Sequence, residues 1–168
     1  MTTHYLRWLL LPVFALFALA VEAAEFVKIN GVTPPPLALK DRSGKVHSLD
    51  AYKGKVVLVN FWATWCPPCR EEMPSMQRLK EKMAGRPFVM LGVNSGEQPA
   101  DLDAFLKRIK VDFTLLLDPD SAATKRWKVY GLPASFLIDK QGRVRYALAG
   151  PTEWDEGKAV SLIEGLMR

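Results

Sequence analysis

Residues 61–69 read FWATWCPPC, and the organisation of the chain can be worked out from what surrounds them. The preceding residues 56–60, VVLVN, are mostly apolar and β-branched, which predicts a strand buried on both faces of a sheet. The following residues predict a helix from Pro67 to about Ala84. The chain's two cysteines, Cys66 and Cys69, therefore lie where a buried strand passes into a helix.

On both sides of this junction, short apolar runs alternate with stretches of helical spacing. Strands are expected at 26–30, 37–40, 45–48, 88–93, 113–117, 134–138 and 143–149, and further helices at 99–109, 122–128 and 153–167. The polar turn DRSG at 41–44 predicts an N-terminal hairpin. These alternations indicate an α/β fold with a central mixed sheet flanked by helices, formed as one domain by residues 24–168.

The spacing of the cysteines favours chemistry over structural cross-linking. A disulfide stabilises partly by closing a loop in the unfolded chain, and the effect falls as the loop shortens. A four-residue loop gives roughly 1.9 kcal/mol, against about 3 kcal/mol for fifteen residues. A zinc site would need further ligands, and the only histidines are His4 and His47. The pair therefore predicts a redox-active disulfide, with no metal.

The position of each cysteine predicts its role in thiol–disulfide exchange. Cys66 stands at the start of the helix, where free N–H groups favour a thiolate, so it is expected to be the exposed nucleophile. Pro67 and Pro68 fit the first turn, where their missing N–H groups cost nothing. Cys69 lies one turn deeper on the same face and is expected to resolve the mixed disulfide.

The first 23 residues predict export. Residues 8–21 carry no charge, a length that suits the apolar region of a secretory signal and falls short of a spanning helix. Residues 1–23 are therefore interpreted as a signal peptide or an uncleaved membrane anchor, and the domain as periplasmic or extracytoplasmic. The net charge of +5 comes from basic residues interleaved with acidic ones, which does not favour nucleic-acid binding.

Two longer motifs carry a resemblance to a known family. VVLVNFWATWCPPCREEMP at 56–74 and GLPASFLID at 131–139 resemble the thioredoxin-like thiol–disulfide oxidoreductases of the TlpA/ResA/CcmG type. The resemblance implies a thioredoxin fold with an N-terminal hairpin and a strand–helix insertion at 88–110. It also implies an extracytoplasmic protein, often membrane-tethered, that reduces disulfides of partner proteins, for example in cytochrome c maturation. No bound cofactor is implied, and a membrane thiol reductase would supply electrons.

The resemblance also suggests roles for individual residues. Pro133 matches a proline that is cis in the family and would leave the backbone of Leu132 free to pair with a substrate strand. Trp65 is expected on the exposed rim where a partner docks. Glu72, one turn beyond Cys69, would accept its proton or raise a thiol pKa. The alternative is that Glu72 only favours the helix dipole, a role that Glu71 could equally fill.

Two other functions of thioredoxin-like proteins fit this sequence less well than disulfide reduction. Thioredoxin-like copper-handling proteins typically use C-x-x-x-C with a distant histidine, whereas here the spacing is one residue shorter and His47 precedes the motif. Thiol peroxidases lack a C-x-x-C pair at this junction. Asn60 stands where thioredoxin has a titratable aspartate, so that proton route is absent. Strong oxidants usually have a histidine between the cysteines, so Pro67-Pro68 favours a reductant.

Overall fold

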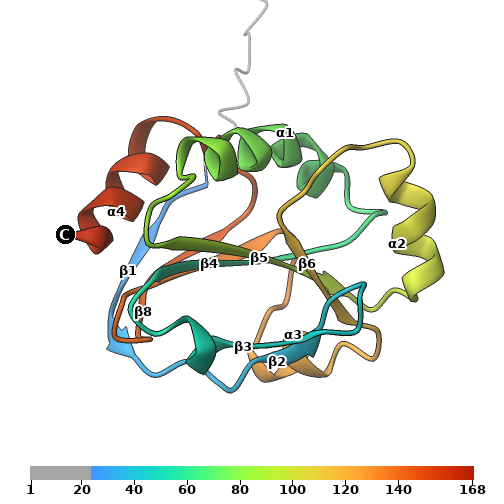
Figure 1. Ribbon diagram of the computed structural model, residues 1–168, viewed down its shortest axis with the longest axis horizontal. Helices are drawn as coiled ribbons and strands as arrows, with labels where there is room; N and C mark the ends of the chain where they lie inside the picture. The colour runs from blue at the N-terminus through green and yellow to red at the C-terminus, as the bar shows by residue number, and fades with distance from the viewer. Residues whose placement is uncertain (1–23) are drawn as a thin grey trace, which may run out of the picture.

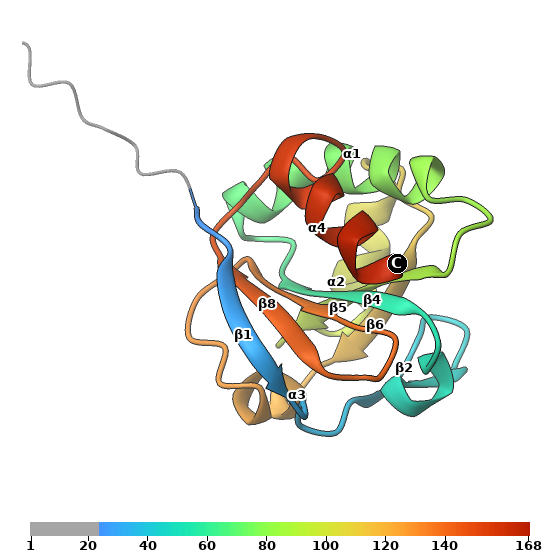
Figure 2. The ribbon, with the colours of Figure 1, turned by 90° about the vertical axis from the view of Figure 1, so that its left-hand side faces the viewer.

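The computed structural model describes residues 24–168, and its centre is a six-stranded mixed sheet. In spatial order the strands are β1 (Val27–Val32), β8 (Val144–Ala149), β7 (Ala134–Ile138), β4 (Val56–Trp62), β5 (Phe88–Ser95) and β6 (Thr114–Asp118). Strands β4, β5 and β6 are parallel, whereas β7 runs antiparallel to β4, and β1 closes one edge against β8 (Figure 2). The N-terminal hairpin forms a separate two-stranded sheet of β2 (Ala38–Lys40) and β3 (Val46–Ser48), followed by a 3-10 turn at Leu49–Tyr52.

Helices cover both faces of the sheet. Helices α1 (Pro67–Lys82), α2 (Pro99–Leu106) and α4 (Gly157–Met167) lie on one side, while α3 (Ala122–Arg126) and the hairpin lie on the other (Figure 1). The expected mixed sheet, hairpin and strand–helix insertion are therefore all present. Residues 1–23, interpreted from the sequence as a signal or anchor, lie outside the described residues. Within residues 24–168, no helix is both long and apolar enough to cross a membrane.

Strand β4 separates two hydrophobic cores because successive side chains of a strand point to opposite faces. Leu58 and Trp62 are fully buried in the core beneath α1, α2 and α4. Val59 and Phe61 are fully buried in the core beneath α3 and the hairpin. Between Leu58 and Trp62 the same alternation brings the polar side chain of Asn60, which is 1% exposed, to the α1 side. One polar residue thus interrupts an otherwise apolar strand.

Helices α2 and α4 differ most from the bounds that the sequence predicts. Helix α2 ends at Leu106 rather than at residue 109, and α4 begins at Gly157 rather than at residue 153. The residues before α4 instead form an irregular segment, and the indole of Trp154 within it is completely buried. Helical spacing of apolar residues cannot distinguish these arrangements, because a buried Trp satisfies either one.

Candidate active site

The two cysteines form a disulfide at the N-terminus of α1. The bond joins Cys66 and Cys69, whose Cα atoms lie 5.3 Å apart. Cys66 is the N-cap residue, and its Sγ accepts a hydrogen bond from the backbone N–H of Cys69 at 3.3 Å. Pro67 and Pro68 occupy the first turn, as expected. Because the two prolines have no N–H, the N–H of Cys69 is the one backbone donor within residues 24–168 to the sulfur that would carry the thiolate charge.

Exposure differs sharply between Trp65 and the cysteine beside it. The Trp65 side chain is 67% exposed, which places it on the rim as expected. Cys66 is only 3% exposed and Cys69 is fully buried, so the relative order is as expected. However, the expectation of an exposed Cys66 is wrong for the disulfide form, because the cap position turns its sulfur towards the first turn of the helix. A partner must reach Cys66 through the rim around it.

The loop before the cysteines is held by Glu97, a residue that the sequence analysis missed. The carboxylate of Glu97, 7% exposed, accepts hydrogen bonds from the backbone N–H and the hydroxyl of Thr64, the former at 2.7 Å. It also accepts one from Asn94 Nδ2 at 2.6 Å. The only sequence signal is its position just after β5, whose end lies beside the end of the parallel strand β4.

The start of β7 lies beside the end of β4, which brings Pro133 to the end of the sheet from which the cysteine loop leaves. Ala134 pairs with Phe61 near the end of β4, and the Leu132–Pro133 peptide bond is cis. Pro133 uses its carbonyl oxygen to accept a hydrogen bond from the N–H of Gly150 at 2.9 Å. A groove of about 370 Å³ runs beside Leu132 and Pro133, and the side chain of Tyr130, 93% exposed, lies at it.

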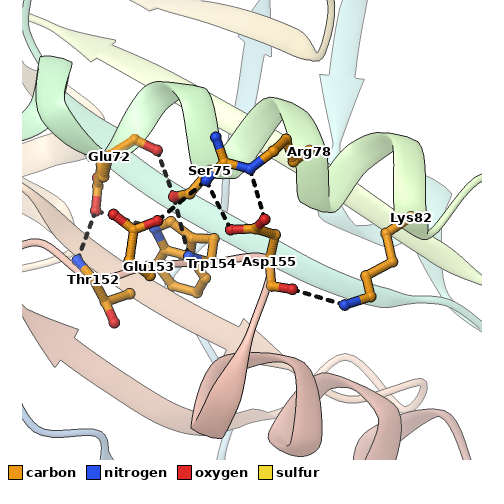
Figure 3. Close-up of polar contacts among 8 residues, drawn as sticks. All are labelled: Glu72, Ser75, Arg78, Lys82, Thr152, Glu153, Trp154 and Asp155. Carbon is orange, nitrogen blue, oxygen red and sulfur yellow. Dashed lines mark hydrogen bonds and ion pairs between the residues drawn. The ribbon is translucent and has the colours of Figure 1, made fainter.

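Glu72 is buried on the inner face of α1, and the first turn of this helix contains no acidic residue that would act on the helix dipole there. The side chain of Glu72 is 2% exposed. Oε1 accepts a hydrogen bond from Asn60 Nδ2 at 2.8 Å, and Oε2 accepts one from the indole N–H of Trp154 at 3.0 Å. The backbone N–H of Thr152 also donates to Oε2, at 3.3 Å (Figure 3). Asn60 donates further to Ser135 Oγ at 2.9 Å.

The surroundings of Glu72 contain hydrogen-bond donors but no cation in contact with the carboxylate. Within residues 24–168, Glu72 forms no ion pair. Burial therefore raises the pKa of Glu72 to about 7, although the hydrogen bonds from Trp154, Asn60 and Thr152 lower it in part. A carboxyl with a pKa near neutrality can accept and release a proton at physiological pH.

Both ring nitrogens of His47, the second histidine of the sequence, already have hydrogen-bonding partners. His47 lies in β3, 8% exposed, and its Nδ1 lies 2.5 Å from Tyr52 Oη while its Nε2 lies 2.7 Å from Asp41 Oδ2. Both ring nitrogens thus have partners within the hairpin region. In the part of the chain that the structure describes, no three His, Cys, Asp or Glu side chains are grouped to hold a metal ion.

Comparison with known proteins identifies the relatives of this chain. Residues 31–147 match the AhpC/TSA family. The chain is 38% identical over 120 residues to the thiol–disulfide oxidoreductase ResA of Geobacillus thermodenitrificans, covering 71% of this chain and 69% of that protein. It is 35% identical over 131 residues to ResA of Bacillus subtilis, covering 78% and 73% respectively.

A solved structure supports the same grouping. A Chlorobium tepidum protein described as a thiol:disulfide interchange protein DsbE superimposes with a TM-score of 0.77 at 31% identity, covering 84% of this chain and all of that one. These relatives and the sheet order confirm the expected thioredoxin-like fold. They also confirm the reaction class, dithiol–disulfide exchange through Cys66 and Cys69. The chain belongs to the AhpC/TSA family, among its ResA-like thiol–disulfide oxidoreductases.

Proposed function

We propose that the protein reduces disulfides of extracytoplasmic partner proteins, with Cys66 as nucleophile and Cys69 as resolving thiol. Glu72 accepts the proton that the Cys69 thiol loses. The observation that carries the proposal is a disulfide at a helix N-terminus, one turn from a buried carboxyl whose pKa is about 7. Disulfides in partners of cytochrome c maturation are the leading substrate class, and a membrane thiol reductase is the electron donor.

The reaction proceeds by two exchanges. The Cys66 thiolate attacks one sulfur of the partner's disulfide, forming a mixed disulfide and releasing the partner's other sulfur as a thiolate that takes up a proton. Cys69 then loses its proton and attacks Cys66 Sγ, which releases the partner's second sulfur as a thiolate that takes up a proton and leaves the Cys66–Cys69 disulfide. Glu72, three residues beyond Cys69 on the same helix face, accepts the proton that Cys69 loses. The reductase returns two electrons and two protons.

The groove beside Pro133 supports a docking mode for the partner. Within residues 24–168 the backbone N–H and C=O groups of Leu132 form no hydrogen bond with the rest of the backbone. They are free to pair with an extended segment that carries the target cysteine, in the manner of an added strand. Trp65 on one side and the groove at Leu132 and Tyr130 on the other would contact residues that flank this cysteine.

The direction of transfer and the compartment rest on sequence features. No histidine between the cysteines stabilises the Cys66 thiolate, so the reduced form is not strongly favoured and the protein acts as a reductant. The charge-free residues 8–21 support export, with residues 1–23 as a cleaved signal or a membrane tether. A C-terminal reporter active only in the cytoplasm would contradict export.

Activity assays and a trapping experiment test the proposal together. The domain of residues 24–168 should reduce insulin, and Cys66→Ser should abolish the activity. Cys69→Ser should instead accumulate mixed disulfides in the exporting host, and their identification names the partner. A potential above about −180 mV, the value of protein disulfide isomerase, would refute the reductant assignment. Stoichiometric Cu(I) binding without insulin reduction would support the copper-handling alternative.

A further inference from the structure

We propose that Trp154 is a positioning residue for this reaction: its indole N–H fixes the Glu72 carboxyl, and the segment 151–156 carries the indole into place beneath α1. The inference rests on the proposed role of Glu72. Trp154 lies 82 residues after Glu72 in the chain and outside α1 and α4, so no local chain geometry requires the two residues to be in contact.

Several contacts fasten this segment along α1 (Figure 3). The backbone N–H of Trp154 donates to Ser75 Oγ at 3.1 Å, and Ser75 in turn donates to the carbonyl oxygen of Glu72 at 2.8 Å. Arg78 holds the Asp155 carboxylate, with Nε 2.6 Å from Oδ2. Lys82 donates to the Asp155 carbonyl oxygen at 2.8 Å. The residues on either side of the indole are therefore anchored to one helix, which limits how Trp154 can move.

The segment supplies both donors to one oxygen of Glu72. Oε2 accepts from the Trp154 indole and the Thr152 N–H, while Oε1 is held from the opposite side by Asn60 of β4. The remaining polar neighbours are Ser135 of β7, which binds Asn60, and Ser75 of α1. The charge of Glu153 raises the pKa of Glu72, while Arg78 of α1 forms ion pairs with Glu153 and Asp155.

The other buried indoles show that this hydrogen bond is not a general property of the core. The Nε1 atoms of Trp62 and Trp127 are buried and have no hydrogen-bond partner within the described chain. All three rings are buried, at 0%, 5% and 0% exposure for Trp62, Trp127 and Trp154. Among these three, Trp154 alone donates a hydrogen bond, and its acceptor is the carboxyl of Glu72, whose pKa burial raises to about 7. Packing is thus common to the three residues, whereas donation distinguishes Trp154.

The experiment measures the titration of the Glu72 carboxyl itself. Carbon-13 NMR of side-chain-labelled glutamate is recorded against pH for the oxidised protein, with Glu72→Gln identifying the resonance. Trp154→Phe keeps an aromatic ring against Phe26, whose centroid lies 5.8 Å away, and removes the donor. Because a lost donor destabilises the ionised form, the midpoint should rise by about one pH unit. Trp127→Phe is the matched control and should leave the midpoint unchanged.

A second variant and a second readout keep the inference testable. If Trp154→Phe does not fold, Ser75→Ala removes the bond that anchors Trp154, and the midpoint should rise by a smaller amount. In the reduced protein, the pH profile of Cys66 alkylation should move with the Glu72 midpoint. An unmoved midpoint in folded Trp154→Phe, or an equal movement in Trp127→Phe, overturns the inference. A shifted midpoint in a protein that reduces no disulfide supports positioning and refutes the proposed reaction.

Discussion

Two carboxyl groups of this protein have almost equal exposed fractions, yet their pKa values shift in opposite directions. Glu72 beneath α1 is 2% exposed, and Asp139 at the β7–β8 turn is 3% exposed. Burial raises the pKa of Asp139 too, but hydrogen bonds and charge from Arg143 and Arg145 outweigh it, so the pKa of Asp139 ends below its usual value. Glu72 has only neutral donors, and its pKa rises to about 7.

The difference shows what burial alone does not determine. Asp139 also accepts hydrogen bonds from the N–H groups of Gln141 and Arg143, so it fixes a turn while staying ionised. A permanently charged group holds structure well but cannot exchange protons near neutral pH. Glu72 is buried without a cation in contact with its carboxyl, and its raised pKa is what the proposed proton transfer requires. The identity of the neighbours therefore decides whether a shielded carboxyl stays ionised at neutral pH.

The largest expected effect comes from removing the ionised member of the pair. Asp139→Ala should lower the free energy of unfolding by about 3 kcal/mol, because the N–H groups of Gln141 and Arg143 lose their acceptor. The partly exposed side chains of Arg143 and Arg145 also lose their shared carboxylate, which contributes less. The pH dependence of disulfide exchange should not change. Chemical denaturation measures the first quantity and insulin reduction against pH the second. Asp50→Ala, which breaks the exposed pair with Lys53, is the control and should have little effect on stability.

The next effect concerns how the free energy of unfolding of the oxidised protein depends on pH. Because folding raises the pKa of Glu72 from 4.5 to about 7, its contribution is present below pH 4.5 and is lost as pH rises through 7. Glu72→Gln cannot lose it, so the stability difference between mutant and wild type should grow in the mutant's favour by at most about 3 kcal/mol. Urea denaturation at pH 5 and pH 8 measures this. A difference that does not depend on pH would contradict the raised pKa.

The sequence predicts the cysteine pair and Pro133 better than it predicts the surroundings of Glu72. Cys66, Cys69 and Pro133 fall in motifs with a local spacing, and the strands around them follow from apolar runs. The neighbours of Glu72 come from β4, β7 and the segment before α4, and no local pattern joins them. The sequence places Trp154 in a helix, because an apolar residue at helical spacing gives no sign that its indole N–H binds a carboxyl group instead.

A smaller effect is expected at Glu97, which is buried like Glu72 but binds the loop before the cysteines. Glu97→Ala leaves the N–H of Thr64 and the amide of Asn94 without their acceptor, which should cost roughly 2 kcal/mol of stability. The pH dependence of stability that is due to Glu72 should remain, because the two carboxyls share no hydrogen-bond partner. Parallel denaturation at pH 5 and pH 8 checks both statements. Loss of that pH dependence in Glu97→Ala would show that the carboxyls are coupled.

The smallest expected effect is on the reduction potential, through repulsion between the charge of ionised Glu72 and that of the Cys66 thiolate. An ionised Glu72 disfavours a nearby thiolate, so Glu72→Gln should lower the pKa of the Cys66 thiol and stabilise the reduced form. One pKa unit corresponds to about 1.4 kcal/mol, or about 30 mV for two electrons, which sets the upper limit of the rise in potential. Since the pKa of Glu72 is about 7, the rise should be larger at pH 8 than at pH 6, where wild-type Glu72 is mostly protonated. Glutathione-buffered titrations at both pH values measure it, and Glu71→Gln, the same change at an exposed position of α1, is the matched control. An equal rise in Glu71→Gln, or none in Glu72→Gln, would mean that the burial of Glu72 does not act on the cysteines.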